Sequence, residues 1–78
     1  MNFTVYSKND CPYCYKVKTV LELTKSNFAV YTLDSDFTRD EFYSEFGEGS
    51  TFPQVVCDGT KLGGCIDTIN FLREQKIV

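Results

Sequence analysis

The sequence contains no histidine, and this absence removes several kinds of chemistry at once. Without imidazole, the chain cannot build a Cys-His nucleophile pair, a histidine-bearing zinc site or a histidine general base. Any reaction that it catalyses must therefore use sulfur, carboxylates or backbone groups.

Long apolar runs and an excess of basic residues are also missing. No stretch approaches the roughly 18 apolar residues of a membrane span, so we expect no membrane insertion. The 8 basic and 11 acidic residues give a net charge of -3, which disfavours nucleic-acid binding through a basic surface. Residues 1–4 lack the basic and apolar regions of a secretory signal, so we expect a cytoplasmic protein.

What the chain does contain suits one small folded domain. Its 78 residues are 42% hydrophobic and 15% aromatic, too few for a second domain and too apolar for disorder. No repeat, low-complexity tract or linker interrupts them, so we predict a single domain over residues 1–78, acting as a monomer. Charge is uneven: residues 34–48 hold six carboxylates against Arg39 alone, as expected for a solvated face.

Hydrophobic patterning predicts a βαβ unit in the first half of the chain. Residues 3–6 and 28–33 are rich in β-forming residues. Between them, residues 12–25 carry an apolar stripe of helical period that starts after Pro12. Such a unit is expected to be parallel and right-handed.

A capping box and a hairpin turn mark the next three elements. Thr38 followed by Glu41 opens a second helix, which Gly47 is suited to close. Residues 54–57 and 60–62 flank an Asp-Gly pair that favours a tight turn. The sequence therefore predicts an antiparallel hairpin after the second helix.

A third helix completes the order β-α-β-α-β-β-α. It covers roughly residues 65–75, and Ile66, Ile69 and Leu72 are expected to face inward. The economical arrangement of these elements is an α/β fold, with one mixed four-stranded sheet flanked by three helices.

Four cysteines carry the remaining chemistry: Cys11, Cys14, Cys57 and Cys65. The first two form a C-x-x-C motif where the first strand gives way to the first helix, which is a thioredoxin-type redox signal. Cys11 occupies the N-cap, where free backbone N–H groups, the helix dipole and nearby Lys8 favour a thiolate of lowered pKa. Cys11 is therefore the predicted nucleophile, and Cys14 the resolving thiol.

Other interpretations of the cysteines remain open. The C-x-x-C pair could be structural, although a strand-to-helix junction is poorly suited to packing it. All four cysteines could ligate zinc or an iron–sulfur cluster, although Cys57 and Cys65 lack a second C-x-x-C knuckle. Cys57 lies in a predicted strand and is expected to be a small buried residue.

Three motifs in order resemble the glutaredoxin family. Residues 11–14 read Cys-Pro-Tyr-Cys, like the dithiol active-site motif. Residues 51–53 read Thr-Phe-Pro, like the family's Thr-Val-Pro segment with its cis proline, and residues 63–67 read Gly-Gly-Cys-Ile-Asp, like its Gly-Gly-x-x-Asp segment. The resemblance implies a minimal thioredoxin-like fold. The short chain is similar to bacterial or phage-encoded members, and for the latter the cytoplasm would be the host's.

The resemblance also implies an activity. A dithiol glutaredoxin is a glutathione-dependent oxidoreductase that reduces protein disulfides and glutathione mixed disulfides, with glutathione as co-substrate and no tightly bound cofactor or metal. Glutathione reductase with NADPH would supply electrons, and disulfide-bearing proteins such as ribonucleotide reductase would be clients. Two alternatives remain: a redoxin served by thioredoxin reductase, and two chains sharing a [2Fe–2S] cluster through Cys11 and two glutathiones.

Residues that match the family motifs define a predicted glutathione site. Lys8 would meet the glycine carboxylate, and the backbone of Phe52 would pair with the peptide. Backbone N–H groups at the start of the last helix would hold the γ-glutamyl carboxylate, and Asp67 would accept from its ammonium or only cap the helix. The full predicted set is Lys8, Tyr13, Thr51, Phe52, Pro53, Gly64, Cys65, Ile66 and Asp67.

Three of these residues depart from the family pattern or have weaker claims. Ile66 stands where members often carry Asp, Ser or Thr, so one side-chain hydrogen bond to glutathione is lost, at a cost on the order of 1 kcal/mol. Phe52 replaces the usual valine and adds apolar bulk. Cys65 occupies a position where cysteine is not catalytic, and an oxidative dimer or a regulatory role is a hypothesis.

Overall fold

The computed structural model describes residues 1–77 and confirms the predicted order of elements. Val78, the last residue of the predicted domain, lies outside the described residues. In chain order the elements are β1 (Asn2–Ser7), α1 (Pro12–Leu23), β2 (Asn27–Thr32), α2 (Arg39–Phe46), β3 (Gln54–Cys57), β4 (Thr60–Gly63) and α3 (Cys65–Glu74).

The four strands form one mixed sheet in the order β2-β1-β3-β4. β1 and β2 pair in parallel along their whole length, as expected for a βαβ unit. β3 pairs antiparallel with both β1 and β4, and Asp58 and Gly59 at the hairpin turn both have positive φ, which this turn requires. The predicted fold class is therefore confirmed.

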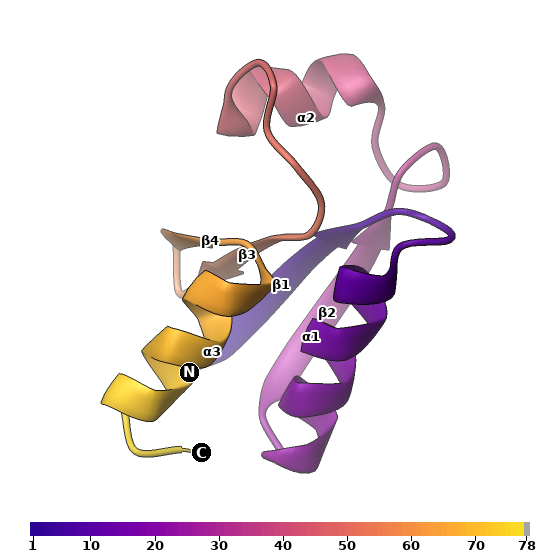
Figure 1. The fold of residues 1–78 in the computed structure, drawn as a ribbon. Coiled ribbons are helices and arrows are strands. Elements are labelled where there is room, and N and C mark those ends of the chain that lie inside the picture. Colours follow the sequence, from indigo (N-terminus) through magenta and orange to yellow (C-terminus); the bar gives the residue numbers. More distant parts are fainter. Residues whose placement is uncertain (78) are drawn as a thin grey trace.

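Helices α1 and α3 lie together on one face of the sheet (Figure 1). Alternate residues of β1 point toward them, and the core between the layers centres on side chains without exposed surface, among them Val5, Val17, Leu21, Val55 and Leu72. None of the helices within the described residues is long and apolar enough to cross a membrane.

Helix α2 lies beyond the end of the sheet, at the top of Figure 1, rather than over its centre. Its start is fixed by the predicted capping box, because the Thr38 hydroxyl accepts from the Glu41 N–H and the Glu41 carboxylate accepts from the Thr38 N–H. Its aromatic side chains join it to the sheet: the ring of Phe46 packs 5.1 Å from that of Tyr6 on β1.

Two expectations about the helices were wrong. α1 ends at Leu23 rather than residue 25, because the Thr24 hydroxyl bonds back to the Val20 carbonyl and Lys25 has a positive φ of 55°. Ile66 does not face inward and is 68% exposed. The buried face of α3 is formed by Cys65, Thr68 and Leu72. Ile66 follows Cys65 directly and therefore lies off this face, where it points to solvent.

Candidate active site

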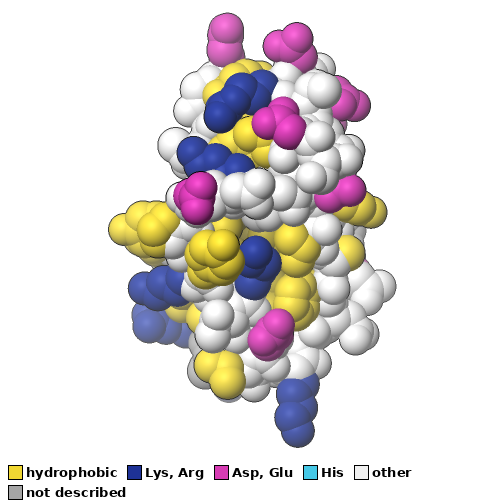
Figure 2. Space-filling view, turned by 90° about the vertical axis from the view of Figure 1, so that its right-hand side faces the viewer, with side chains coloured by type: hydrophobic (Ala, Val, Ile, Leu, Met, Phe, Trp, Pro, Cys, Tyr) yellow, Lys and Arg dark blue, Asp and Glu magenta, His cyan; other side chains and the backbone are white. Residues whose placement is uncertain are grey.

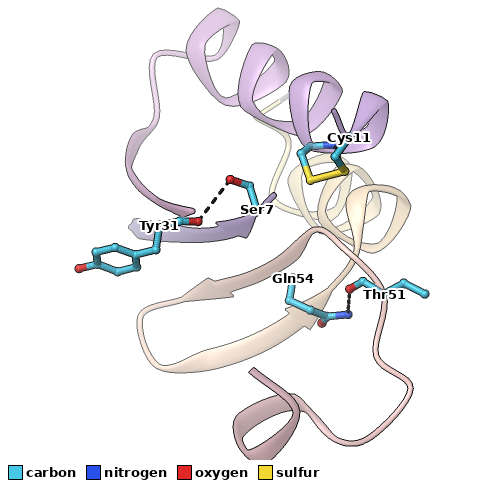
Figure 3. The surroundings of a disulfide bond; sticks show 6 residues. Ser7, Cys11, Tyr31, Thr51 and Gln54 are labelled. Carbon is cyan, nitrogen blue, oxygen red and sulfur yellow. Dashed lines mark hydrogen bonds between the residues drawn. A yellow bond between two sulfur atoms is a disulfide. The ribbon is translucent and has the colours of Figure 1, made fainter. Parts of the chain in front are cut away.

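Cys11 and Cys14 form a disulfide at the junction of β1 and α1 (Figure 3), with their Cα atoms 5.2 Å apart. Cys11 has extended backbone geometry at the N-cap, Pro12 opens the helix, and the Cys14 N–H donates to the Cys11 Sγ at 3.2 Å. A donor already aimed at that sulfur stabilises a thiolate there, because charge-assisted hydrogen bonds are stronger than neutral ones.

The two cysteines differ in access to solvent. Cys11 retains 5% of its surface, whereas Cys14 has none and lies beneath it. A disulfide substrate must reach the attacking sulfur, so of these two cysteines only Cys11 is accessible to a substrate. The strand that leads to it is fixed by the buried Ser7, whose hydroxyl donates to the Tyr31 carbonyl at 3.3 Å (Figure 3).

A cavity beside the pair brings together most of the predicted glutathione residues. The Phe52–Pro53 peptide bond is cis, as the resemblance implied. The segment around it faces the start of α3 across a cavity of about 310 Å³, lined by Tyr13, Thr51, Phe52, Pro53, Gly64, Cys65 and Ile66. These residues come from α1, from the segment that follows α2 and from the N-terminal turn of α3.

Lys8 and Asp67, the other two predicted residues, do not line this cavity. The Lys8 ammonium lies 5.4 Å from the centre of the Phe52 ring, so one wall of the cavity carries a positive charge at its edge. Asp67 caps its own helix: its Oδ2 accepts from the Gly64 N–H at 3.1 Å. Gly63 has a φ of +110°, and a Cβ there would collide with the Asp67 carboxylate.

Cys57 and Cys65 are free thiols, and both are buried. Burial raises the pKa of each, with Asp58 adding to the effect at Cys57 and Lys16 opposing it at Cys65. Thiols with a raised pKa stay protonated at neutral pH and are poor nucleophiles. Within residues 1–77, no group of three or more cysteine or carboxylate side chains is placed to hold a metal ion.

Sequence reasoning missed the aromatic support behind the cavity. The Phe52 ring stacks on that of Phe42 from α2, with ring centres 4.1 Å apart and planes within 10°. Phe37 stacks on both of these rings. The high aromatic content was visible in the sequence, but these contacts join residues far apart in the chain, so no local pattern could pair them.

The comparisons with known proteins agree with this geometry. The family model described as glutaredoxin matches residues 3–62. Glutaredoxin-C6 of Oryza sativa subsp. japonica is 36% identical over 77 residues, which is 95% of this chain and 69% of the relative. The chain belongs to the glutaredoxin family. Glutaredoxin membership and the Cys11–Cys14 disulfide make it a thiol–disulfide oxidoreductase.

Solved glutaredoxin structures share this fold. The reduced Escherichia coli glutaredoxin superposes with a TM-score of 0.83 over the whole of both chains, at 19% identity. A buckwheat glutaredoxin–glutathione complex superposes with a TM-score of 0.79, at 25% identity, covering 96% of this chain and 71% of the buckwheat chain.

Proposed function

We propose that this glutaredoxin reduces glutathione mixed disulfides and protein disulfides, with glutathione as its co-substrate. The observation that carries the proposal is the cavity of about 310 Å³ between the cis-Pro53 segment and α3, next to the redox pair. Its size falls at the lower end of small-molecule sites, roughly 300–1,000 Å³. The buckwheat relative, whose structure is a complex with glutathione, supports this choice of ligand.

Both ends of this cavity suit the carboxylates of a small peptide. The Lys8 ammonium, beside Phe52, would attract the glycine carboxylate. The first N–H groups of α3, a helix of 10 residues, would hold the γ-glutamyl carboxylate, because unpaired donors and the helix dipole favour an anion there. The cysteine of the tripeptide, between these ends, would then face Cys11.

Reduction of a glutathione mixed disulfide would use Cys11 alone. The Cys11 thiolate attacks the glutathione sulfur, an S–S bond forms between them, and the protein sulfur leaves with the electron pair and takes up a proton. A second glutathione thiolate then attacks the glutathione sulfur of this mixed disulfide. Oxidised glutathione leaves, and the Cys11 thiolate is restored.

Reduction of a protein disulfide would use both cysteines. Cys11 attacks one client sulfur and becomes linked to it, while the other client sulfur leaves as a thiol. Cys14 then attacks the Cys11 sulfur, so that the Cys11–Cys14 bond forms and the second client thiol is released. Two glutathiones, oxidised to one disulfide, would return this bond to the dithiol.

The setting that we propose is the cytoplasm, with glutathione kept reduced by glutathione reductase and NADPH. Two unpaired thiols, Cys57 and Cys65, support a reducing compartment.

The experiment is NADPH-coupled reduction of the mixed disulfide of glutathione and 2-mercaptoethanol, with glutathione and glutathione reductase in one arm and thioredoxin reductase in the other. Activity in the first arm alone is expected. Lys8→Gln should raise the KM for the mixed disulfide several-fold, whereas Lys25→Gln, the same charge change just beyond the C-terminal end of α1, should not. Activity only with thioredoxin reductase would contradict the proposal.

A further inference from the structure

A second cavity lies on the α2 side of the molecule, and the reaction proposed above does not use it. It has a volume of about 210 Å³ and is lined by Tyr6, Phe37, Glu41, Phe42, Glu45 and Phe46. We call this cavity the α2 groove. Four aromatic rings form its walls, and two carboxylates stand at its edge.

The α2 groove and the glutathione cavity share one aromatic wall. Phe52 lines the cavity beside Pro53, and its ring stacks directly on Phe42, which lines the groove. The stacked Phe42–Phe52 pair therefore joins the linings of the two cavities.

The charge of this end of the molecule favours a cationic occupant. Acidic side chains gather at the α2 end, at the top of Figure 2, with hydrophobic and basic side chains among them. Acidic charge dominates the sequence here, since residues 34–48 hold six carboxylates against Arg39 alone. The Glu41 carboxylate accepts from the Thr38 N–H at 2.9 Å. Within residues 1–77 it forms no ion pair with a lysine or arginine. Burial, the neighbouring Tyr31 and, least, the Glu45 carboxylate raise the pKa of Tyr6, so the Tyr6 phenol stays neutral.

Lys61, on β4, shows how Glu45 and Phe46 can hold a cation at the edge of the groove, and its ammonium also donates to the Glu45 backbone carbonyl. The Lys61 ammonium lies 5.4 Å from the centre of the Phe46 ring and 3.5 Å from Glu45 Oε1. An aromatic face together with a carboxylate is a favourable environment for an ammonium or guanidinium group. Lys61 contacts Phe46 and Glu45, and among the described contacts Tyr6, Phe37 and Glu41 make no such contact with it.

We propose that the α2 groove docks a client polypeptide through a lysine or arginine that flanks its reactive cysteine, so that clients with basic flanks are reduced preferentially. The inference rests on the proposed function, because it assigns the protein substrates of the same redox site. The aromatic walls take the aliphatic stem of the basic side chain, and Glu41 and Glu45 attract its head group.

The test uses two S-glutathionylated peptides that differ only in lysine or glutamate on both sides of the cysteine. In the wild type we expect a higher kcat/KM for the lysine peptide than for the glutamate peptide. In the double variant Glu41→Gln/Glu45→Gln we expect kcat/KM for the lysine peptide to fall about fivefold, which is the effect of losing two exposed charge pairs. The matched control Asp40→Asn/Glu48→Gln removes the same charge from exposed positions outside the groove and should change the value little.

A third variant has the opposite expected sign. Lys61→Gln frees the Glu45 carboxylate and the Phe46 ring, so it should raise kcat/KM for the lysine peptide. Equal rates for the two peptides in the wild type, or equal losses in the groove variant and its charge control, would overturn the proposal.

A binding measurement separates this inference from the proposed function. Serine versions of both peptides, which cannot react, are titrated while the amide NMR signals of α2 are followed. Shifts around Phe42 and Phe46 with the lysine peptide alone support docking, even for a protein inactive on the small mixed disulfide. Full activity on that disulfide without any such shifts would overturn the docking site alone.

Discussion

At the scale of single residues, Ile66 is the position where the proposed glutathione site lacks a side-chain hydrogen bond. It lines the proposed glutathione cavity, is 68% exposed and brings no hydrogen-bonding group. We expect Ile66→Thr to lower the KM for glutathione about fivefold, because one hydrogen bond contributes about 1 kcal/mol. Steady-state kinetics measure this, and an unchanged melting temperature would show that the gain is local. A higher KM would contradict this role of Ile66.

Two buried thiols make a pH-dependent contribution to stability. Burial raises the pKa of Cys57 and Cys65 above the ordinary value of 9.0. The unfolded chain therefore loses these protons first as the pH rises, so the stabilisation is fully present below about pH 9 and is lost as the pH climbs through the raised pKa values.

Urea unfolding under reductant checks this pH dependence. Cys11→Ala/Cys14→Ala is the background, so that the redox pair does not titrate. The free energy of unfolding should fall above about pH 9, and adding Cys57→Ala and Cys65→Ala should flatten this fall. A slope that survives removal of both thiols would assign the effect to other groups, and Tyr6, whose pKa is also raised, would be the next to replace.

The proposed glutathione site shows how much of a site single residues reveal in a sequence. Seven of the nine residues predicted from motif resemblance line one cavity in the structure. The cis bond before Pro53 was also foreseen through the resemblance, since X-Pro bonds are mostly trans. For Asp67 the sequence allowed a helix cap and a ligand contact; the cap is present as the bond to Gly64, and the ligand contact stays a prediction.

At the scale of elements, α2 depends on its cap more than on its length. It has only 8 residues, and Thr38 and Glu41 form the capping box at its N-terminus. We expect Thr38→Ala to lower the free energy of unfolding by about 1 kcal/mol, because the N–H of Glu41 loses its partner. Ser44→Ala, at an exposed position of the same helix, is the control and should stay within about 0.5 kcal/mol. Equal effects in urea titrations would contradict the account.

Elements were predictable where local chemistry defines them. The capping box, the Asp-Gly hairpin and β3 follow from short patterns, and all three are present. The position of α2 at one end of the sheet was not predictable, because it depends on aromatic contacts with Tyr6 and Phe52 that lie far away in the sequence.

At the scale of the whole molecule, the small size leaves little stability to lose. For 78 residues the free energy of unfolding is expected to be about 4–12 kcal/mol. Phe42 is 2% exposed and lies at the centre of the aromatic contacts that hold α2.

Loss of this ring should therefore affect the complete fold. We expect Phe42→Ala to cost about 3–5 kcal/mol and to lower the melting temperature by more than about 12 °C. Leu23→Ala, which truncates a side chain that is 78% exposed, should cost less than about 0.5 kcal/mol. Thermal melts followed by circular dichroism compare the two, and a small shift for Phe42→Ala would show that α2 is dispensable.

The central claim is that Cys11 attacks and Cys14 resolves, and trapping tests it most directly. Cys14→Ser and Cys11→Ser are each incubated with a glutathionylated peptide and analysed by intact mass and peptide mapping. The account predicts that Cys14→Ser accumulates one glutathione on Cys11 and still reduces glutathione mixed disulfides, and that Cys11→Ser does neither. Glutathione trapped on Cys14 in an active Cys11→Ser variant would contradict it.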